Sequence, residues 1–119
     1  MADKVLVVEG DRDLREVMIE VLRAEGVDAE GVGDAESACA RLVGEPFRAL
    51  LFDPGRPGAA LSVLETVMRG AGSFGTPVVL VSGCGGMAHR ASELGVAFVR
   101  KPFDVGDLIG AVERAGSRL

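Results

Sequence analysis

Four side chains that could take part in ionic or nucleophilic chemistry each follow a short apolar run in this sequence. They are Glu9, Asp53, Ser82 and Lys101. Short apolar runs are typical of buried strands, so each of these side chains should lie where a strand opens into a loop. In an open α/β sheet, ligands bind in the crevice outside the carboxyl ends of the strands. We therefore expect carboxylates, a hydroxyl and an ammonium group to gather at one edge of an otherwise apolar sheet.

Asp53 is the most informative of the four residues. It ends the apolar run over residues 49–52 and precedes a string of turn-forming residues, Pro54-Gly55-Arg56-Pro57-Gly58. Taken alone, Asp53 could be a turn former, because Asp before Pro often starts a turn. In the same way Lys101 could be a solvated surface lysine, and Ser82 could begin a turn or cap a helix. The occurrence of all four polar residues after apolar runs favours a functional site over these separate structural roles.

Strand-like runs alternate with helix-like stretches along the chain. Strands are predicted over residues 4–8, 27–32, 49–52, 78–81 and 97–99. Helices are predicted over residues 11–25, 34–43, 61–68, 87–94 and from 104 onwards, with a glycine-rich connection over 70–76. Apolar residues at helical spacing define the inward faces, which are expected to include Val17 and Val105. The predicted helix caps are Asp11, Asp34 and Asp104, and the predicted helix ends are Gly26 and Gly95.

This alternation predicts the fold class. Strands that alternate with helices indicate a parallel sheet covered by helices on both faces. Right-handed crossovers and short loops leave few topologies, and we predict an α/β, doubly wound (βα)5 flavodoxin-like sheet with strand order 2-1-3-4-5. This order places the first and third strands side by side, so Glu9 and Asp53 become neighbours. Two converging carboxylates form an oxygen-rich site for a hard divalent cation, and Mg²⁺ is the natural ion.

Composition limits the class of protein. A length of 119 residues suits one domain, predicted over residues 1–119. Hydrophobic residues make up 48% and charged residues 26% of the chain, as in ordinary globular proteins. No apolar stretch approaches the ~20 residues that span a bilayer, and the start of the chain lacks the features of a signal peptide. We therefore expect a cytoplasmic protein without a membrane partner.

The charge and the aromatic content argue against direct binding to nucleic acid. The net charge is −5, and the sequence has no basic run that could supply a cationic footprint. The absence of Trp and Tyr removes the best stacking platforms for single strands. The two cysteines, Cys39 and Cys84, are interpreted as free thiols in a reducing compartment.

Four motifs, in order along the chain, resemble those of the receiver domains of two-component response regulators. They are Val7-Val8-Glu9, Leu51-Phe52-Asp53 with Pro57-Gly58, Val81-Ser82 and Lys101-Pro102-Phe103. Each motif is weak alone, but all four at near-family spacing are specific, and the resemblance extends from Lys4 to about Ala115. It implies a signalling switch rather than an enzyme, of the stand-alone single-domain type.

The resemblance implies a role for each matching residue. Asp53 matches the phosphoryl acceptor, a nucleophilic carboxylate whose donor is a histidine kinase or a histidine phosphotransferase. Lys101 matches the lysine that pairs with the acceptor, and Ser82 matches the hydroxyl that bonds to the phosphoryl group. Glu9, Asp53 and the backbone carbonyl of Gly55 match the positions that hold Mg²⁺.

The resemblance also implies how the signal leaves the domain. Phe98 matches the switch aromatic, whose burial changes the surface formed by the fourth helix, fifth strand and fifth helix. Considered alone, Phe98 would be read as a core residue. Phosphorylation adds about −1.5 to −2 charges, which would bias a loop through Ser82 towards contact with a downstream protein that the sequence does not identify. Pro102 suggests a cis peptide bond.

The acidic pocket departs from the family pattern. The family usually carries two adjacent acids after the first strand, but here the second position is Gly10. The loss of a hard oxygen ligand predicts weakened Mg²⁺ affinity. Glu9 could reach further inward, Asp11 could turn in, or water could fill the site; for Asp11 we favour the role of helix cap. A second departure is the glycine-rich loop over residues 83–86, which precedes a short helix and leaves the choice of partner open.

Two other functions stay open at this point. The first is a receiver-like interaction module that works without phosphorylation, which Gly10 and the altered loop would suit. The second is a small flavodoxin-like enzyme or ligand-binding protein, because the fold does not determine the function. This second alternative is weaker, since the sequence has no glycine fingerprint after the first strand and no additional pair of nucleophile and base.

Overall fold

Strands and helices alternate along the whole described part of the chain, which in the computed structural model comprises residues 3–55 and 60–116. The elements are β1 (Val5–Val8), α1 (Arg12–Ala24), β2 (Ala29–Val32), α2 (Ala35–Leu42), β3 (Ala49–Phe52), α3 (Ala60–Gly72), β4 (Val78–Ser82), α4 (Gly85–Leu94), β5 (Ala97–Arg100) and α5 (Val105–Gly116). Pro57 and Gly58 of the predicted motif lie outside the described residues. In the two described ranges, no helix has the length and apolar character needed to cross a membrane.

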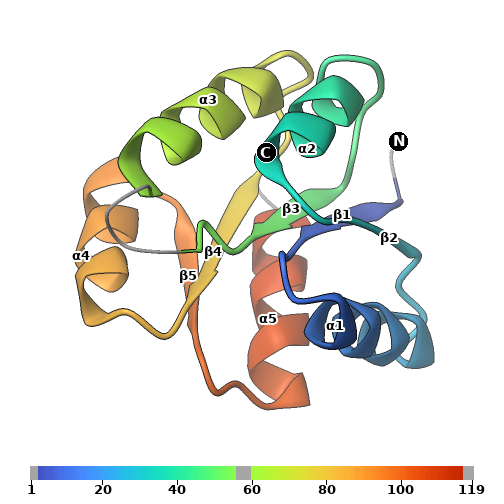
Figure 1. Ribbon diagram of the computed structural model, residues 1–119. Helices are drawn as coiled ribbons and strands as arrows, with labels where there is room; N and C mark the ends of the chain where they lie inside the picture. The colour runs from blue at the N-terminus through green and yellow to red at the C-terminus, as the bar shows by residue number, and fades with distance from the viewer. Residues whose placement is uncertain (1–2, 56–59, 117–119) are drawn as a thin grey trace.

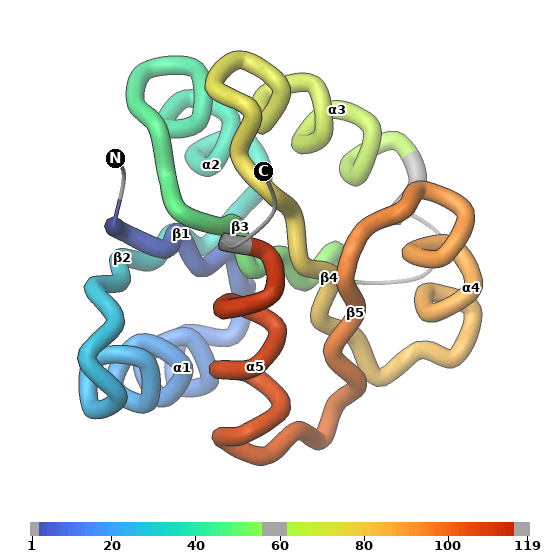
Figure 2. The backbone as a smooth tube through the Cα atoms, turned by 180° about the vertical axis from the view of Figure 1, so that it is seen from behind, coloured from blue at the N-terminus to red at the C-terminus, as the bar shows by residue number. Residues whose placement is uncertain are grey.

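All five strands run parallel in one sheet, in the order β2-β1-β3-β4-β5. The helices cover both faces: α1 and α5 lie on one, and α2, α3 and α4 lie on the other (Figures 1 and 2). This arrangement confirms the predicted doubly wound topology, and it makes β1 and β3 neighbours.

The strand sequences are continuously apolar because the sheet is covered on both sides. Successive side chains of a strand point to opposite faces, so Val5 and Val7 pack beneath α1 and α5 while Leu6 and Val8 pack beneath α2 and α3. Every residue of β1, β3 and β4 is buried. Strands buried on both faces are the expected source of such apolar runs in parallel sheets.

Several helices begin at a capping aspartate and end at a glycine, as predicted. Asp34 and Asp104 each accept a backbone N–H from the first turn of α2 and α5, at 2.7 and 2.8 Å. Gly26 and Gly95 follow α1 and α4 with φ angles of 82° and 69°. Only glycine adopts this left-handed conformation at little cost, so these positions end the helices.

The inward faces of two helices differ from the prediction. Val17 and Val105 are 50% and 44% exposed. In α1, Ile19 packs against the core instead, and its Cδ1 lies in the space left by the missing side chain of Gly31. Helical spacing alone does not show how far a helix is rotated about its axis, and the small residue on the neighbouring strand decides this rotation.

Two helices are longer than predicted. The third helix, α3, continues to Gly72 through a segment expected to be a connection. It does so because its residues Val67 and Ala71 pack into the core. The fourth helix begins at Gly85 rather than Met87, so part of the expected glycine loop forms its first turn. In α3 this burial overrides the low helix propensity of glycine, whereas Gly85 and Gly86 at the start of α4 are exposed.

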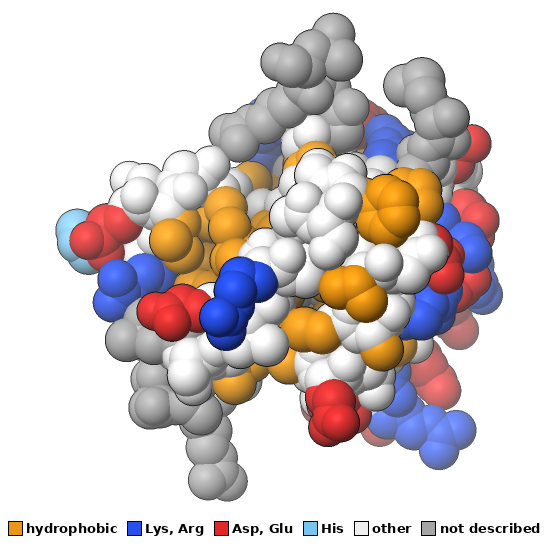
Figure 3. Space-filling view, turned by 90° about the horizontal axis from the view of Figure 1, so that it is seen from above, with side chains coloured by type: hydrophobic (Ala, Val, Ile, Leu, Met, Phe, Trp, Pro, Cys, Tyr) orange, Lys and Arg blue, Asp and Glu red, His pale blue; other side chains and the backbone are white. Residues whose placement is uncertain are grey.

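The face over α2, α3 and α4 carries no single-sign patch in its described part. Figure 3 shows hydrophobic side chains between acidic and basic ones on this face. A groove of about 300 Å³ separates α3 from α4, and it is lined by Leu64, Met68 and Leu94 together with Arg69 and Arg90.

Two glycines allow a matched test of these helix ends. Gly95→Ala should lower the free energy of unfolding by about 1 kcal/mol, because an L-residue is strained in the left-handed region. Gly72→Ala should instead raise it, by up to about 1 kcal/mol, since Gly72 has helical backbone and open space where the methyl group would lie. Urea unfolding monitored by circular dichroism measures both values. Equal effects of the two substitutions would contradict the assignment of Gly95 as the helix end.

Candidate functional site

The site lies at the carboxyl edge of the sheet, where the register of the strands brings distant residues together. Val8 pairs with Phe52 at the ends of β1 and β3, so Glu9 and Asp53 leave the sheet side by side. Ser82 is the last residue of β4, and its carbonyl accepts the N–H of Lys101 at 3.0 Å. The structure therefore places all four polar residues at one edge, as the strand order predicted.

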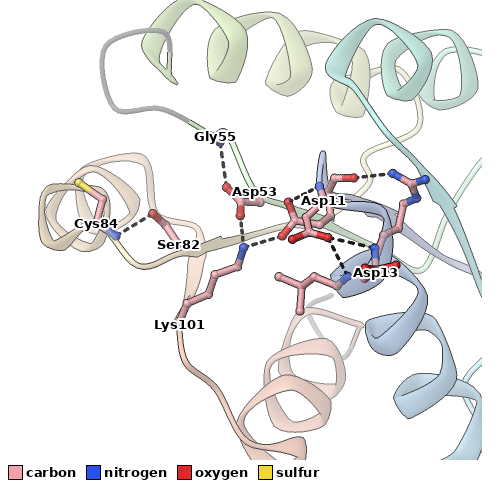
Figure 4. Close-up of polar contacts among 10 residues, drawn as sticks. Asp11, Asp13, Asp53, Gly55, Ser82, Cys84 and Lys101 are labelled. Carbon is pink, nitrogen blue, oxygen red and sulfur yellow. Dashed lines mark hydrogen bonds and ion pairs between the residues drawn. The ribbon is translucent and has the colours of Figure 1, made fainter.

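Three of these residues form one ionic cluster. The ammonium nitrogen of Lys101 lies 2.5 Å from Glu9 Oε1 and also donates to Asp53 Oδ2 (Figure 4). The side chains of Glu9, Asp53 and Lys101 are 7%, 12% and 23% exposed. Little water reaches the two carboxylates, so their mutual repulsion is balanced mainly by this shared ammonium group.

The environment of Lys101 keeps its charge in place. Burial lowers the pKa of Lys101, but the hydrogen bonds that Lys101 donates to Asp53 and Glu9 outweigh this effect and leave the pKa above its ordinary value. The ammonium group is therefore fully protonated near neutral pH. It can act as a permanent positive charge beside the carboxylate of Asp53.

The second carboxylate oxygen of Asp53 is held by the backbone. Asp53 Oδ1 accepts the N–H of Gly55 at 2.8 Å. Gly55 has a φ angle of 79°, which glycine adopts without strain. The turn after β3 therefore fixes the orientation of the carboxylate, and it carries the Gly55 carbonyl that was expected to face a metal ion.

Position 10 leaves open space beside Glu9. A Cβ atom at Gly10 would lie 3.8 Å from its nearest neighbour, the carbonyl oxygen of Gly33. Asp11 does not fill the space with its carboxylate, because its Oδ1 accepts the N–H groups of Asp13 and Leu14 at 3.0 and 3.2 Å. The predicted role of Asp11 as the cap of α1 is confirmed.

A cleft of about 330 Å³ adjoins these residues, lined in part by Glu9, Gly10, Asp53 and Gly55. Within residues 3–55 and 60–116, no group of three or more Asp, Glu, His or Cys side chains is placed to hold a metal ion. Two carboxylates and a carbonyl still suit Mg²⁺, which commonly keeps several waters and binds through one or two carboxylates. The donor chemistry therefore fits Mg²⁺ bound by few protein ligands. Lys101 donates hydrogen bonds to the same two carboxylates.

Ser82 and Phe98 lie outside the ionic cluster. Ser82 is only 4% exposed, and its Oγ accepts the N–H of Cys84 at 3.0 Å. Figure 4 shows this hydroxyl directed towards Cys84 and away from Asp53. Phe98 is partly buried and packs against the core on the side of α2, α3 and α4. The peptide bond between Lys101 and Pro102 is cis, as predicted.

One further residue at this site has no counterpart in the sequence-based prediction. Arg15, in the first turns of α1, donates from Nη1 to the carbonyl oxygen of Glu9 at 2.8 Å. Its side chain runs past Gly31 and Gly33, which leave room for it. The pair of glycines around the end of β2 was the available signal, although spacing alone does not connect it to Arg15.

Comparisons with known proteins agree with this geometry. The chain is 34% identical over 117 residues to the response regulator protein FleR of Pseudomonas aeruginosa, covering 96% of this chain and 24% of that protein. The chain spans about a quarter of the length of the curated relatives it matches. No protein-family model matches the sequence.

Solved structures show the same similarity in three dimensions. The structure of NtrX from Brucella abortus is 30% identical with a TM-score of 0.77, covering 98% of this chain and 27% of that chain. The structure of a response regulator from Chloroflexus aurantiacus has a TM-score of 0.83 at 21% identity, covering 99% of this chain and all of that chain. At this level of identity the second comparison shows the fold alone.

The capping role of Asp11 can be separated from a role in metal binding. Asp11→Ala should lower the free energy of unfolding by about 1 kcal/mol, because two N–H groups at the start of α1 lose their acceptor. Asp11→Asn should retain most of the stability, since Asn caps helices as well as Asp does. Urea unfolding of the two variants tests this difference. A loss of stability in Asp11→Asn as large as in Asp11→Ala would show that the charge, and not the cap, matters.

Proposed function

The chain is a receiver domain of the response-regulator type, and we propose that it is a phosphoacceptor switch in which Asp53 receives the phosphoryl group. Receiver domains are signalling switches rather than catalysts, and the fold and its relatives fit such a switch in a two-component pathway. The observation that supports Asp53 most strongly is its carboxylate at the end of β3, in contact with the ammonium group of Lys101. We also propose that the receiver occupies residues 1–119 as a single domain.

In the proposed transfer, a carboxylate oxygen of Asp53 attacks the phosphorus atom of a phosphohistidine. The donor is a histidine kinase or a histidine phosphotransferase. A P–O bond forms as the P–N bond breaks, and the imidazole nitrogen keeps the electron pair and takes up a proton. Lys101 then turns its ammonium group from the carboxylate to the phosphoryl oxygens. Such a reaction needs positioning and charge neutralisation more than covalent help from the protein.

The proposed metal ligands are the carboxylates of Glu9 and Asp53 and the backbone carbonyl of Gly55. Mg²⁺, when bound, would neutralise negative charge on the transferring phosphoryl group. The Gly55 N–H holds Asp53 Oδ1 in a fixed direction during the reaction. Because Gly10 supplies no side-chain oxygen, and Lys101 shares both carboxylates, we expect Mg²⁺ affinity to be lower than in a site with two adjacent acids.

In the proposed switch, a conformational change is transmitted from Asp53 to the start of α4. A phosphoryl group adds about −1.5 to −2 charges next to Ser82, and it offers oxygens to which the Ser82 hydroxyl can donate. Turning towards those oxygens would release the N–H of Cys84, which Ser82 Oγ accepts at present. Cys84 immediately precedes α4, so this exchange would alter the surface that includes α4, β5 with Phe98, and α5. The output is contact with a downstream protein at that surface.

A receiver-like interaction module that works without phosphorylation is the second candidate. The observation in its favour is that Lys101 already bridges both acids while position 10 supplies none. In that case the ammonium group would stand permanently in place of a metal ion, and the surface of the domain would not depend on Asp53. The two candidates differ in whether Asp53 can be phosphorylated.

The first experiment tests Asp53 directly. With acetyl phosphate and millimolar Mg²⁺, intact mass spectrometry should detect one added phosphoryl group, and Asp53→Asn should abolish it. Asp28→Asn is the matched control, because Asp28 is exposed and precedes β2 at the opposite edge of the sheet. Absence of the added mass, in a reaction where a competent receiver is labelled, would overturn the proposal and favour the module that works without phosphorylation.

A second experiment tests the missing acid. Gly10→Asp should strengthen Mg²⁺ binding by about tenfold or more, because it adds a charged oxygen ligand at a position with open space and an ordinary φ angle. Gly10→Asn has the same size without the charge and should give a smaller gain. Titration with Mg²⁺, followed through backbone amide chemical shifts, measures both affinities. Equal affinity in the wild type and Gly10→Asp would contradict Gly10 as the cause of the weak site.

A further inference from the structure

The turn between β1 and α1 contains few groups that can hold it in place. Glu9 donates its N–H to the carbonyl oxygen of Val32, the last residue of β2, at 3.2 Å. The next residue, Gly10, is exposed and has no side chain. The N–H of Asp11 approaches Glu9 Oε2 only at 3.5 Å, which is the limit of a hydrogen bond. Lys101 holds Oε1 of the Glu9 carboxylate, so on the side of the turn the direction of this carboxylate depends on how its own backbone is anchored.

Arg15 provides that anchor from one side. Its Nη1 donates to the Glu9 carbonyl at 2.8 Å, within the range of a good hydrogen bond. The bond comes from a charged donor and is partly buried, which makes it stronger than a bond between neutral groups. It holds the peptide that follows Glu9 and so limits rotation at Gly10.

Two glycines keep the path of Arg15 open. A Cβ atom at Gly31 would lie 3.0 Å from Arg15 Cγ and Cδ, and one at Gly33 would lie 3.1 Å from Nη1. Both glycines have ordinary φ angles, so the turn geometry does not require them. Glycine within or beside a strand weakens it and often marks a close approach of other atoms. At Gly33 the close approach is that of the Arg15 side chain, and at Gly31 it is shared between Arg15 and Ile19, whose Cδ1 would lie 2.7 Å from the Cβ atom.

We propose that Arg15 is a positioning residue for the receiver site, holding Glu9 in the direction that reaches Lys101 and a bound cation. The Arg15 side chain passes over Gly31 and Gly33, and its bond to the Glu9 carbonyl offsets the backbone freedom that Gly10 introduces. This inference rests on the proposed function for its consequences in Mg²⁺ binding. Its structural part, the link from Arg15 to the contact between Glu9 and Lys101, does not depend on phosphorylation.

The test compares two arginines of the same helix. Arg15→Met keeps the apolar stem but removes the donor, whereas Arg12→Met removes a cation that is 80% exposed and that, among residues 3–55 and 60–116, bonds to Glu16. Arg15→Met should weaken Mg²⁺ binding by about tenfold, the lower end for loss of a residue that supports a ligand, and Arg12→Met should not. Arg15→Lys should restore part of the affinity, because an ammonium group can also donate to the Glu9 carbonyl.

A readout without metal separates this inference from the proposed function. In metal-free protein, the Lys101 ammonium signal and its coupling to the Glu9 carboxyl carbon can be followed by ¹⁵N NMR. Arg15→Met should lose this coupling and speed amide exchange at Gly10, whereas Arg12→Met should keep the wild-type signals. Gly33→Ala should weaken the coupling in the same direction as Arg15→Met, since its methyl group would lie 3.1 Å from Nη1 and would shift this donor by a few tenths of an ångström.

The outcomes are distinct for the two proposals. If Arg15→Met lowers only the urea midpoint, while the Lys101 coupling and the Mg²⁺ affinity stay at wild-type values, Arg15 is merely structural and the inference is wrong. If the wild type shows no Mg²⁺ binding and no phosphorylation, the proposed function fails. In that case, loss of the Lys101 coupling in Arg15→Met and its weakening in Gly33→Ala would still support the positioning role.

Discussion

The ammonium group of Lys101 is the interaction on which the site depends. It bridges carboxylates that approach from two different strands, and all three side chains are largely withdrawn from water. Without a cation between them, Glu9 and Asp53 would repel each other in a setting where water cannot screen them well. The site is therefore a balance of charges held by Lys101, and in the proposed function a metal ion or a phosphoryl group would redistribute these contacts.

The burial of the strands brings these charged side chains together. Strands β1, β3 and β4 are covered on both faces, so their polar neighbours in the sequence emerge together at the carboxyl edge. The same burial gives the site a rigid base, because Asp53 donates its N–H to Val8 while its side chain faces Lys101. The turns that carry the remaining polar groups are less constrained, and this is where the chain differs from the usual receiver pattern.

Gly10 connects the chemistry of the site to the packing of α1 against β2. In the proposed metal site an acid at this position would contribute a ligand, whereas glycine contributes no side-chain oxygen and leaves open space. The Arg15 contact with the Glu9 carbonyl restores order to the backbone but not the missing oxygen. In the proposed switch, this reduced acidic pocket would change how strongly phosphorylation depends on a cation.

The sequence by itself determined the alternation of elements, the strand order and the convergence of Glu9, Asp53 and Lys101, because burial on both faces imposes a strong apolar pattern on parallel strands. It also indicated the capping role of Asp11 and the cis bond before Pro102. Only the tertiary structure decided the rotation of α1 that exposes Val17, the extension of α3 to Gly72 and the contact of Arg15 with Glu9. The rotation of α1 and the Arg15 contact depend on the space that Gly31 and Gly33 leave, and the extension of α3 depends on the burial of Val67 and Ala71. Local sequence carries no information about these tertiary neighbours until the chain has folded.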